Sequence, residues 1–467
     1  MDTAIVVFTR DLRLHDNPAL HQAYGRARRV VPLFVIDPAI AAPPNRARFL
    51  AESLADLRAS LRERGADLVL RRGDPAAEVI RLAGAVHATA VYIADDVSHY
   101  ATARRLKLER ECARHRIELT LTPGLTVVPP GELTPAAGGH YRVFTPYWRA
   151  WRVAAWRKRC PVPPHISLPP IEKIGRLPAK TPASPGSPGL ARGGESAGRE
   201  RFVSWRQRLL AGYGENHDDL AGDATSRLSA YLRFGCVSPL EVAIGALDRP
   251  GGEEFCRQLA WRDFFYQVTA AFPDIARKSY RPGAAWHEDR RALDAWREGQ
   301  TGIPIVDAGM RQLAAEGFMH NRARMVTASF LTRNLGIDWA ARPGALRRPA
   351  RRRRRGEQRG QLAVGGRDRP QHPAQPGDEP AAPGRAVRPV RRVRPPLRAG
   401  TGRPRPRLHP HAVAAAPRPA GPAGVSGPAG RAGLTYFAGG VRTESMMYTV
   451  ALAVCTFPQT TLALLTS

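Results

Sequence analysis

The stretch Ala4–Leu20, "AIVVFTRDLRLHDNPAL", decides the fold of the first part of this 467-residue chain. It opens with an uninterrupted apolar run, which is typical of a strand buried on both faces of a sheet. A polar segment follows, and then come Asp16, Asn17 and Pro18, residue types that favour the start of a helix. The stretch therefore predicts a buried strand that leads into a capped helix.

The same alternation continues as far as Thr122. Four further apolar runs, "VVPLFVI", "DLVLRR", "AVYIAD" and "ELTLT", are separated by helix-length segments such as 47–64 and 101–115. Strands that alternate with helices indicate βαβ units, so we predict an α/β domain with a doubly wound parallel sheet over residues 1–130. No glycine-rich phosphate-binding signature occurs, and the sequence names no ligand for this sheet.

Two changes of composition divide the rest of the chain. Residues 131–200 are expected to connect two domains, because they include the Pro-, Gly- and Ser-rich stretch "PAKTPASPGSPGLARGGESAGRE". From residue 201 the apolar residues follow helical spacing, which predicts an all-α domain over 201–339. Residues 340–467 form a tail of different composition.

The charge suggests a polyanionic partner, since the formal net charge is +30. Residues 341–431 hold 22 Arg and 4 acidic residues, which account for +18 of it, and the remainder still suits a nucleic-acid binder. The five cysteines show no C-x-x-C spacing, the first residues lack a basic leader, and the apolar stretch "MMYTVALAVCTF" is too short to span a membrane. We expect a reduced, cytoplasmic protein without a membrane segment or a metal site.

The segment "FTRDLRLHDNPAL", Phe8–Leu20, has a structural and a functional interpretation. Structurally, Asp16 or Asn17 caps a helix and Arg simply pairs with Asp. The full string also closely resembles the opening motif of the DNA photolyase and cryptochrome family. That resemblance implies an antenna chromophore of folate or deazaflavin type in the first domain.

The segment "TSRLSAYLRFG" begins with two hydroxyl residues at the expected start of a helix that runs to about Phe234. They are either caps or part of an anion site, because a helix N-terminus offers unpaired N–H groups to a pyrophosphate. The run resembles the flavin-binding motif of the same family. By this resemblance five residues contact FAD: Tyr213, Thr225, Ser226, Leu228 and Ser229.

The helical segment "EEFCRQLAWRDFFYQV", 253–268, contains a Trp among polar neighbours. Such a Trp is either core or a stacking platform for a base taken out of the duplex. The family resemblance implies that Trp261 stacks on the flipped lesion and that Arg262 belongs to the same wall. Gln258, which we include among the cofactor-binding residues, stands where some relatives have Glu and keeps an acceptor there.

The strongest resemblance lies in "WREGQTGIPIVDAGMRQLAAEGFMHNRARMVTASFL", 296–331. A helix from about His320 places four residues on one face by spacing, namely Asn321, Arg324, Met325 and Ala328. From periodicity alone this is equally a mixed polar face. The resemblance implies that Asn321 faces the flavin ring as a catalytic residue, with Arg324 beside it and with Arg322 and Met325 toward the DNA. Trp286 and Trp339 match two members of the tryptophan chain that carries electrons to the flavin.

The stretch "RRPARRRRRGEQRGQLAVGGRDRP", 347–370, does not fit this family. Residues 341–431 lack Phe, Trp and Tyr, so we expect them to be disordered. The family has a D-G-D element, paired asparagines and a W-x-W in this place. Permitted codons read one base later allow "DDLLDGDVAANNVGNWQWVAG", so we interpret the chain from about residue 340 as frameshifted, through an indel or a sequence error. A basic nucleic-acid-binding arm is the alternative.

The resemblance, which covers residues 1–339, implies a light-driven lyase that binds FAD non-covalently and splits cyclobutane pyrimidine dimers. Damaged DNA is the expected partner and a monomer the expected state. Two alternatives stay open: a cryptochrome-like photoreceptor, and a non-catalytic basic DNA-binding remnant.

Overall fold

The computed structural model describes residues 1–40, 42–179, 186–276 and 286–338. The predictions made for Trp339 and for residues 340–467 lie outside these described residues.

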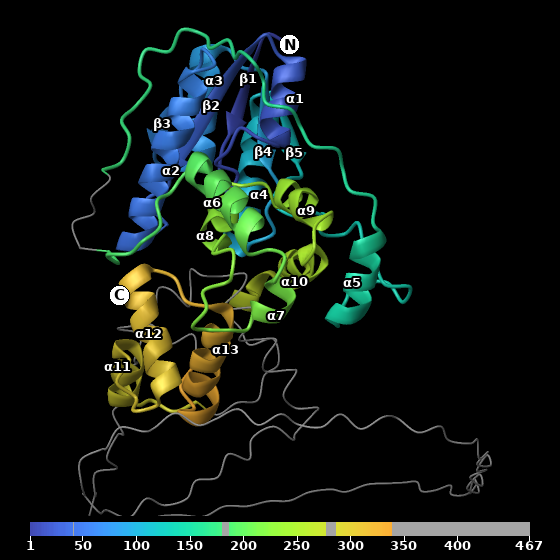
Figure 1. Cartoon of the computed structure of the whole chain (residues 1–467). Helices are drawn as coiled ribbons and strands as arrows, with labels where there is room; N and C mark the ends of the chain where they lie inside the picture. The colour runs from blue at the N-terminus through green and yellow to red at the C-terminus, as the bar shows by residue number, and fades with distance from the viewer. Residues whose placement is uncertain (41, 180–185, 277–285, 339–467) are drawn as a thin grey trace, which may run out of the picture. The chain divides into compact units, whose positions relative to one another are not determined.

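One parallel sheet organises the first part of the chain (Figure 1). Its strands are β1 (Thr3–Val7), β2 (Arg29–Ile36), β3 (Val69–Arg72), β4 (Ala90–Ala94) and β5 (Glu118–Thr122), in the order β3-β2-β1-β4-β5. Ile5 in the central strand pairs with Val31 on one side and with Val91 on the other. The predicted parallel sheet is confirmed. Its switch point lies between β1 and β4, where open α/β sheets bind ligands at the carboxyl ends of the strands.

Helices cover both faces of this sheet. Ala4 and Val6 of β1 share a buried cluster with residues of α1 (Pro18–Arg26) and α2 (Pro44–Arg62). Their neighbours Ile5 and Val7 share a second cluster with residues of α3 (Pro75–Val86) and α4 (His99–Arg114). Because successive side chains of a strand point to opposite faces, β1 is buried on both sides and the doubly wound arrangement is confirmed.

Helix α1 begins as the sequence indicates. Asn17 is the N-cap, and its side chain accepts a hydrogen bond of 3.0 Å from the Leu20 N–H, with Pro18 as the first helical residue. Asp16 is not the cap. Its backbone lies in the left-handed region at φ +50°, and its carboxylate pairs with Arg157 instead.

The second part of the described chain is helical. The predicted helix over 253–268 is α10 (Gly252–Ala271), and the helix expected from about His320 is α13 (Asn321–Ser329). A π-helical turn, Phe330–Asn334, follows α13 directly. The other elements are α5 (Phe144–Val153), α6 (Glu195–Arg208), α7 (Tyr213–Asn216), α8 (Ser229–Phe234), α9 (Pro239–Leu247), α10 (Gly252–Ala271), the 3-10 turn Pro273–Ala276, α11 (Arg290–Glu298), α12 (Pro304–Glu316) and α13 (Asn321–Ser329). No helix within the described ranges is long and apolar enough to cross a membrane.

Two cores support these helices. The largest cluster joins the α1/α2 side of the sheet to α6, α9 and α10, and includes Phe8, Trp205 and Phe264. A separate cluster, with Trp296 and Met310 among its members, holds α11, α12 and α13 together. Residues expected to contact the flavin therefore stand on two different cores.

Candidate functional site

The expected flavin contacts lie between Tyr213, the first residue of α7, and Ser229, the first residue of α8. Tyr213 begins α7 and is 6% exposed, and its ring meets those of Trp205 and Phe255 edge to face at 5.6 Å each. Burial, aided by the charge of Asp218, raises the pKa of Tyr213 to about 12. This phenol is therefore neutral at physiological pH and can act only as a neutral hydrogen-bonding group.

Thr225 and Ser226 lie in a loop, which corrects the expectation that they open a helix. Helix α8 begins at Ser229, because Arg227 adopts a left-handed φ of +52° that no helix tolerates. With only six residues, α8 is also too short to supply a strong N-terminal dipole. The Thr225 hydroxyl oxygen is buried and has no hydrogen-bond partner among the described residues. A buried polar atom of this kind fits a ligand that brings its own donor or acceptor.

Two contacts hold this loop on helix α6. The Trp205 indole N–H donates to the Ala224 carbonyl at 2.9 Å, and Arg201 Nε donates to the Ser226 carbonyl at 3.0 Å. Leu228 is 1% exposed and belongs to the core, so only its backbone can face a ligand. Ser229, the first residue of α8, is exposed.

The expected lesion wall lies on α10. Gln258 is exposed, and Trp261, one helical turn further, is half-buried on the same face. The Trp261 ring is stacked on Phe144 of α5, with centroids 3.7 Å apart and planes 9° from parallel. Arg257 reaches over the same Phe144 ring at 5.9 Å. One ring face of Trp261 therefore packs on protein, as the core interpretation expects, and its role as a stacking platform for a base stays a prediction.

Arg262 lies inside the protein, although the sequence placed it in the DNA-facing wall. Its guanidinium donates to the carbonyls of Leu125 and Leu232 and to the Tyr266 hydroxyl, and it lies over the Tyr266 ring at 4.6 Å. Only 14% of the side chain is exposed. The physical reason is that backbone carbonyls at the α10 surface need donors, and Arg262 supplies them.

The next residue, Asp263, was missed by the sequence reasoning. One of its oxygens accepts hydrogen bonds from the N–H groups of Val127 and Val128 and from the Trp151 indole, at 2.9 to 3.0 Å. Burial outweighs these donors and the charge of Arg262, and raises the pKa of Asp263 to about 6. Asp263 thereby fastens α10 to α5 and to the loop after β5. The available signal was an acidic residue followed directly by the aromatic run Phe264–Tyr266.

Helix α13 turns its small residues inward. Ala323 and Thr327 pack beside Gly309 of α12, whereas Asn321 is exposed and Arg324 and Met325 are half-buried. Ala328, expected on the same face, is 8% exposed. Arg324 Nε donates to the Met319 carbonyl at 3.0 Å. The helix thus leaves Asn321 and Arg324 outside its own core.

Arg322, predicted to face DNA, forms a bidentate ion pair with Asp218, of which Nε–Oδ1 measures 3.1 Å. Both side chains are about half exposed, at 47% and 49%. The pair links α13 to the segment just after Tyr213, and it leaves the Arg322 guanidinium accessible from solvent.

Trp286 is half-buried and directly precedes a backbone bridge, in which the His287 N–H donates to the Gly336 carbonyl at 2.7 Å. This bridge brings the segment of Trp286 to the end of the described chain. Trp339, its expected partner in electron transfer, lies outside the described residues.

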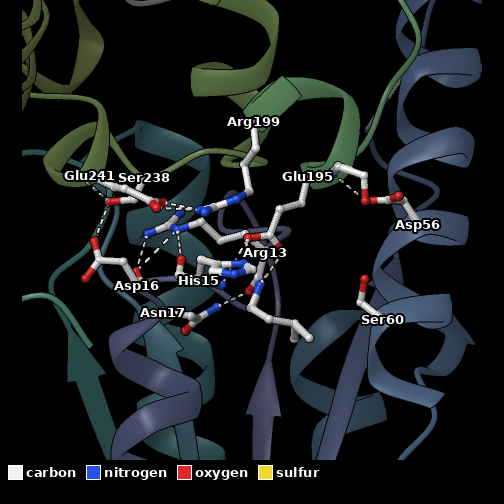
Figure 2. Close-up of polar contacts among 12 residues, drawn as sticks. Arg13, His15, Asp16, Asn17, Asp56, Ser60, Glu195, Arg199, Ser238 and Glu241 are labelled. Carbon is white, nitrogen blue, oxygen red and sulfur yellow. Dashed lines mark hydrogen bonds and ion pairs between the residues drawn. The ribbon is translucent and has the colours of Figure 1, made fainter. Parts of the chain in front are cut away.

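The opening motif forms a buried polar junction with the helical part (Figure 2). Arg13 is fully buried, and its guanidinium donates to the carbonyls of Asp16, Gly124 and Gly235 at 2.9 to 3.1 Å. Arg13 therefore serves backbone carbonyls, which corrects the interpretation that Arg simply pairs with Asp. Every nitrogen of this guanidinium has a partner.

Two carboxylates complete this junction. Glu195, the first residue of α6, accepts from the N–H groups of Leu14 and His15 at 2.7 and 3.0 Å. Asp16 accepts from Arg157 and from the Ser238 hydroxyl. Burial alone would raise the pKa of Asp16, but the hydrogen bonds and charge of Arg157 hold it below its usual value. Glu195 was not singled out from sequence, because its partners lie about 180 residues away.

Comparison with known proteins agrees with these observations. Family models described as "DNA photolyase" and "FAD binding domain of DNA photolyase" match residues 4–165 and 255–347. The second match ends at the first residue of the arginine-rich stretch quoted above.

Individual proteins show the same relationship. The chain is 48% identical over 348 residues to the deoxyribodipyrimidine photo-lyase of Streptomyces griseus, which covers 73% of this chain and 76% of the relative. It is 35% identical to the cryptochrome DASH of Gloeobacter violaceus over 72% of this chain and 73% of the relative. A class III photolyase structure from Agrobacterium tumefaciens matches with a TM-score of 0.69 and 31% identity, over 73% of this chain and 74% of that one.

The parallel sheet, the helices that follow it and the sequence identity across both parts agree, and the chain therefore belongs to the DNA photolyase and cryptochrome family.

Proposed function

We propose that this protein is an FAD-dependent photolyase that uses light to split cyclobutane pyrimidine dimers in damaged DNA. The observation that carries the proposal is the 48% identity to a deoxyribodipyrimidine photo-lyase, which extends over both family regions. Bound FAD would supply light absorption and the electron that opens the cyclobutane ring. The residues of this chain bind the flavin, hold the flipped lesion and exclude water.

The proposed flavin site uses two segments. The buried Thr225 hydroxyl fits a ribityl or phosphate oxygen because it lacks a partner among the described residues. Ser226, Ser229 and the backbone of Leu228 extend this contact, and Tyr213 closes it on the α6 side through its packing on Trp205. Asn321 and Arg324 of α13 approach the ring from the other segment, with Trp286 as a proposed electron donor.

The proposed lesion wall consists of Trp261 and Gln258. A flipped pyrimidine dimer can stack on the part of the Trp261 ring that Phe144 and Phe265 leave exposed, and Gln258 offers hydrogen bonds to its polar edge. We assign Arg262 to positioning this wall, because its donors are engaged with protein acceptors. Arg322 and Met325 remain proposed DNA contacts at the start of α13.

We retain the proposed division into an α/β domain over 1–130, a connection over 131–200, an incomplete helical flavin domain over 201–339 and a tail over 340–467. A second, antenna chromophore is proposed at the carboxyl ends of β1 and β4. The support is that Arg10 and Asp96 meet there at 3.0 Å, at the switch point of the sheet. Cysteine usage supports a cytoplasmic location. We also propose that the protein is a monomer.

Light-dependent repair tests the proposal. The full chain, saturated with added FAD and reduced, should restore dimer-containing oligonucleotides under blue light less efficiently than the frame-restored chain, and neither should do so in the dark. A chain restored to the shifted frame after residue 339 serves as the positive comparison. Flavin-loaded protein that binds such DNA without repairing it would favour a cryptochrome-like photoreceptor. The 35% identity to a cryptochrome DASH supports this alternative. DNA binding by a chain that never takes up FAD would favour the DNA-binding remnant.

A further inference from the structure

Arg227 has a strained, left-handed backbone conformation, and three contacts hold its side chain. Its φ of +52° lies in the left-handed region, which a residue other than glycine adopts only when its surroundings enforce it. Arg227 Nε pairs with Asp223 Oδ1 and Nη1 pairs with Glu316 Oε2, each at 2.5 Å. The guanidinium also lies over the Phe318 ring, 4.5 Å from its centroid.

These contacts connect the two halves of the proposed flavin site. Glu316 is the last residue of α12, and Phe318 stands three residues before the first residue of α13. Arg227 directly follows Thr225 and Ser226, whose loop is fastened to α6 through Ala224 and Ser226. One side chain therefore joins the hydroxyl-bearing loop to the beginning of the helix that carries Asn321.

Arg227 bridges elements that stand on different cores. The Thr225–Ser226 loop is attached to the large cluster, which contains both Trp205 and Leu228. Helices α12 and α13 belong instead to the cluster of Trp296 and Met310. The α12 end is itself anchored, because the Gly189 N–H donates to the Ala315 carbonyl at 2.8 Å. A contact between two anchored elements can set the separation of the groups they carry.

We propose that Arg227 is a positioning residue of the flavin site, a clamp that fixes the Thr225–Ser226 loop against the start of α13. It touches α12, the turn before α13 and its own loop, and it acts on the flavin through them. In this position the Thr225 hydroxyl is held buried and unpaired among the described residues, ready for a flavin oxygen. The inference deepens the proposed function and rests on it for the identity of the ligand.

The test compares Arg227→Ala with Arg227→Gly in the full chain. Both variants remove the clamp, but glycine also relieves the left-handed backbone. Arg290→Ala is the matched control, since Arg290 pairs with Asp294 on the exposed surface of α11. Glu316→Gln removes only the charge of the partner and serves as a milder variant if Arg227→Ala fails to fold.

The first measurement is amide hydrogen exchange over residues 223–229 and 316–324 without added flavin. We expect faster exchange in both segments for Ala and Gly, a smaller increase for Glu316→Gln, and no change for the control. Unchanged protection of both segments in Arg227→Gly and Glu316→Gln would overturn the clamp.

The second measurement is an equilibrium titration with FAD. We expect about tenfold or greater weakening for Ala and Gly, the scale on which supporting residues affect a bound group. If wild type binds FAD and Arg227→Gly binds it equally well, the clamp is refuted while the proposed function stands. If wild type takes up no FAD, the proposed function fails as stated, and the exchange measurement alone decides whether the clamp exists.

Discussion

The junction around Arg13 and the loop around Thr225 are both buried and polar, yet the Arg13 guanidinium and the Thr225 hydroxyl differ in how far they are satisfied. Every nitrogen of the Arg13 guanidinium has a protein acceptor, and Glu195 holds two backbone N–H groups. The Thr225 hydroxyl has no partner among the described residues, and the Arg227 beside it sits on a strained backbone. The first pattern is that of a structural joint, and the second fits the proposed flavin site, because an unpaired buried group is costly until a ligand completes it.

The largest expected effect is on FAD affinity, because the proposed flavin site is incomplete in this chain. Restoring the shifted frame after residue 339 should tighten FAD binding by about 100-fold or more, equivalent to about 2.8 kcal/mol. The reason is that the acidic and amide wall implied by the resemblance exists only in that frame. The measurement is visible flavin absorbance per protein after purification, followed by titration. Stoichiometric flavin in the chain as it stands would contradict the frameshift interpretation.

The structural joint is tested by Arg13→Ala. This change leaves several buried carbonyls without a donor and should lower the free energy of unfolding by about 3–5 kcal/mol. Urea unfolding followed by circular dichroism checks the value, with the exposed Arg110→Ala as control, for which less than about 0.5 kcal/mol is expected. A loss below about 1 kcal/mol would show that the junction is not the main joint of the two parts.

Asp263, which fastens α10 to α5 and to the loop after β5, gives a pH test of a second buried polar contact. Its pKa in the folded protein is raised to about 6, above the value of about 4 expected in the unfolded chain, so the folded state takes up the proton more readily. This preference stabilises the protein fully at low pH and is lost as the pH rises through 6. Relative to Asp263→Asn, wild-type unfolding free energy should therefore fall by about 2 kcal/mol between pH 4 and 7. A constant difference across this range would refute the raised pKa.

On the ligand side, Trp261→Ala should weaken binding to dimer-containing DNA by roughly 1–3 kcal/mol, the scale of base–aromatic stacking. Undamaged duplex should lose far less, since phosphate contacts dominate its binding. Fluorescence anisotropy with the two DNAs measures both affinities, and Leu57→Ala, a fully buried position of α2, controls for general loss of structure. Equal losses on both DNAs would remove the stacking role.

The smallest effect is expected for Arg322→Ala. Its ion pair with Asp218 is about half exposed on both sides, so its loss should change the free energy of unfolding by less than about 1 kcal/mol. If Arg322 contacts phosphate, DNA affinity should fall on both damaged and undamaged duplex and the salt dependence should become shallower. Unfolding and DNA binding measured on the same variant separate the structural role of Arg322 from its role in contacting DNA. Unchanged DNA binding would leave Arg322 with only its surface ion pair to Asp218.

Much of the fold could be predicted from local patterns. The buried strands and the Asn17 cap of α1 depend on residues within a few positions of each other, so the sequence displays them directly. The start of α8 was predicted wrongly, because Arg227 adopts a left-handed conformation that no local pattern announces, and its partner Glu316 lies almost ninety residues away. The acceptors of Arg262, the carbonyls of Leu125 and Leu232, could not be predicted for the same reason, since they lie on distant segments.

The sequence by itself determined the alternating strands and helices, the family and the residue types of the proposed flavin and lesion walls, because these follow from periodicity and contiguous motifs. Only the tertiary structure decided that Arg13 and Glu195 form a structural joint, that Phe144 backs Trp261, and that Arg227 ties the Thr225 loop to α12. The physical reason is that burial and hydrogen-bond satisfaction depend on groups brought together across long sequence separations, whose pairing no local pattern specifies.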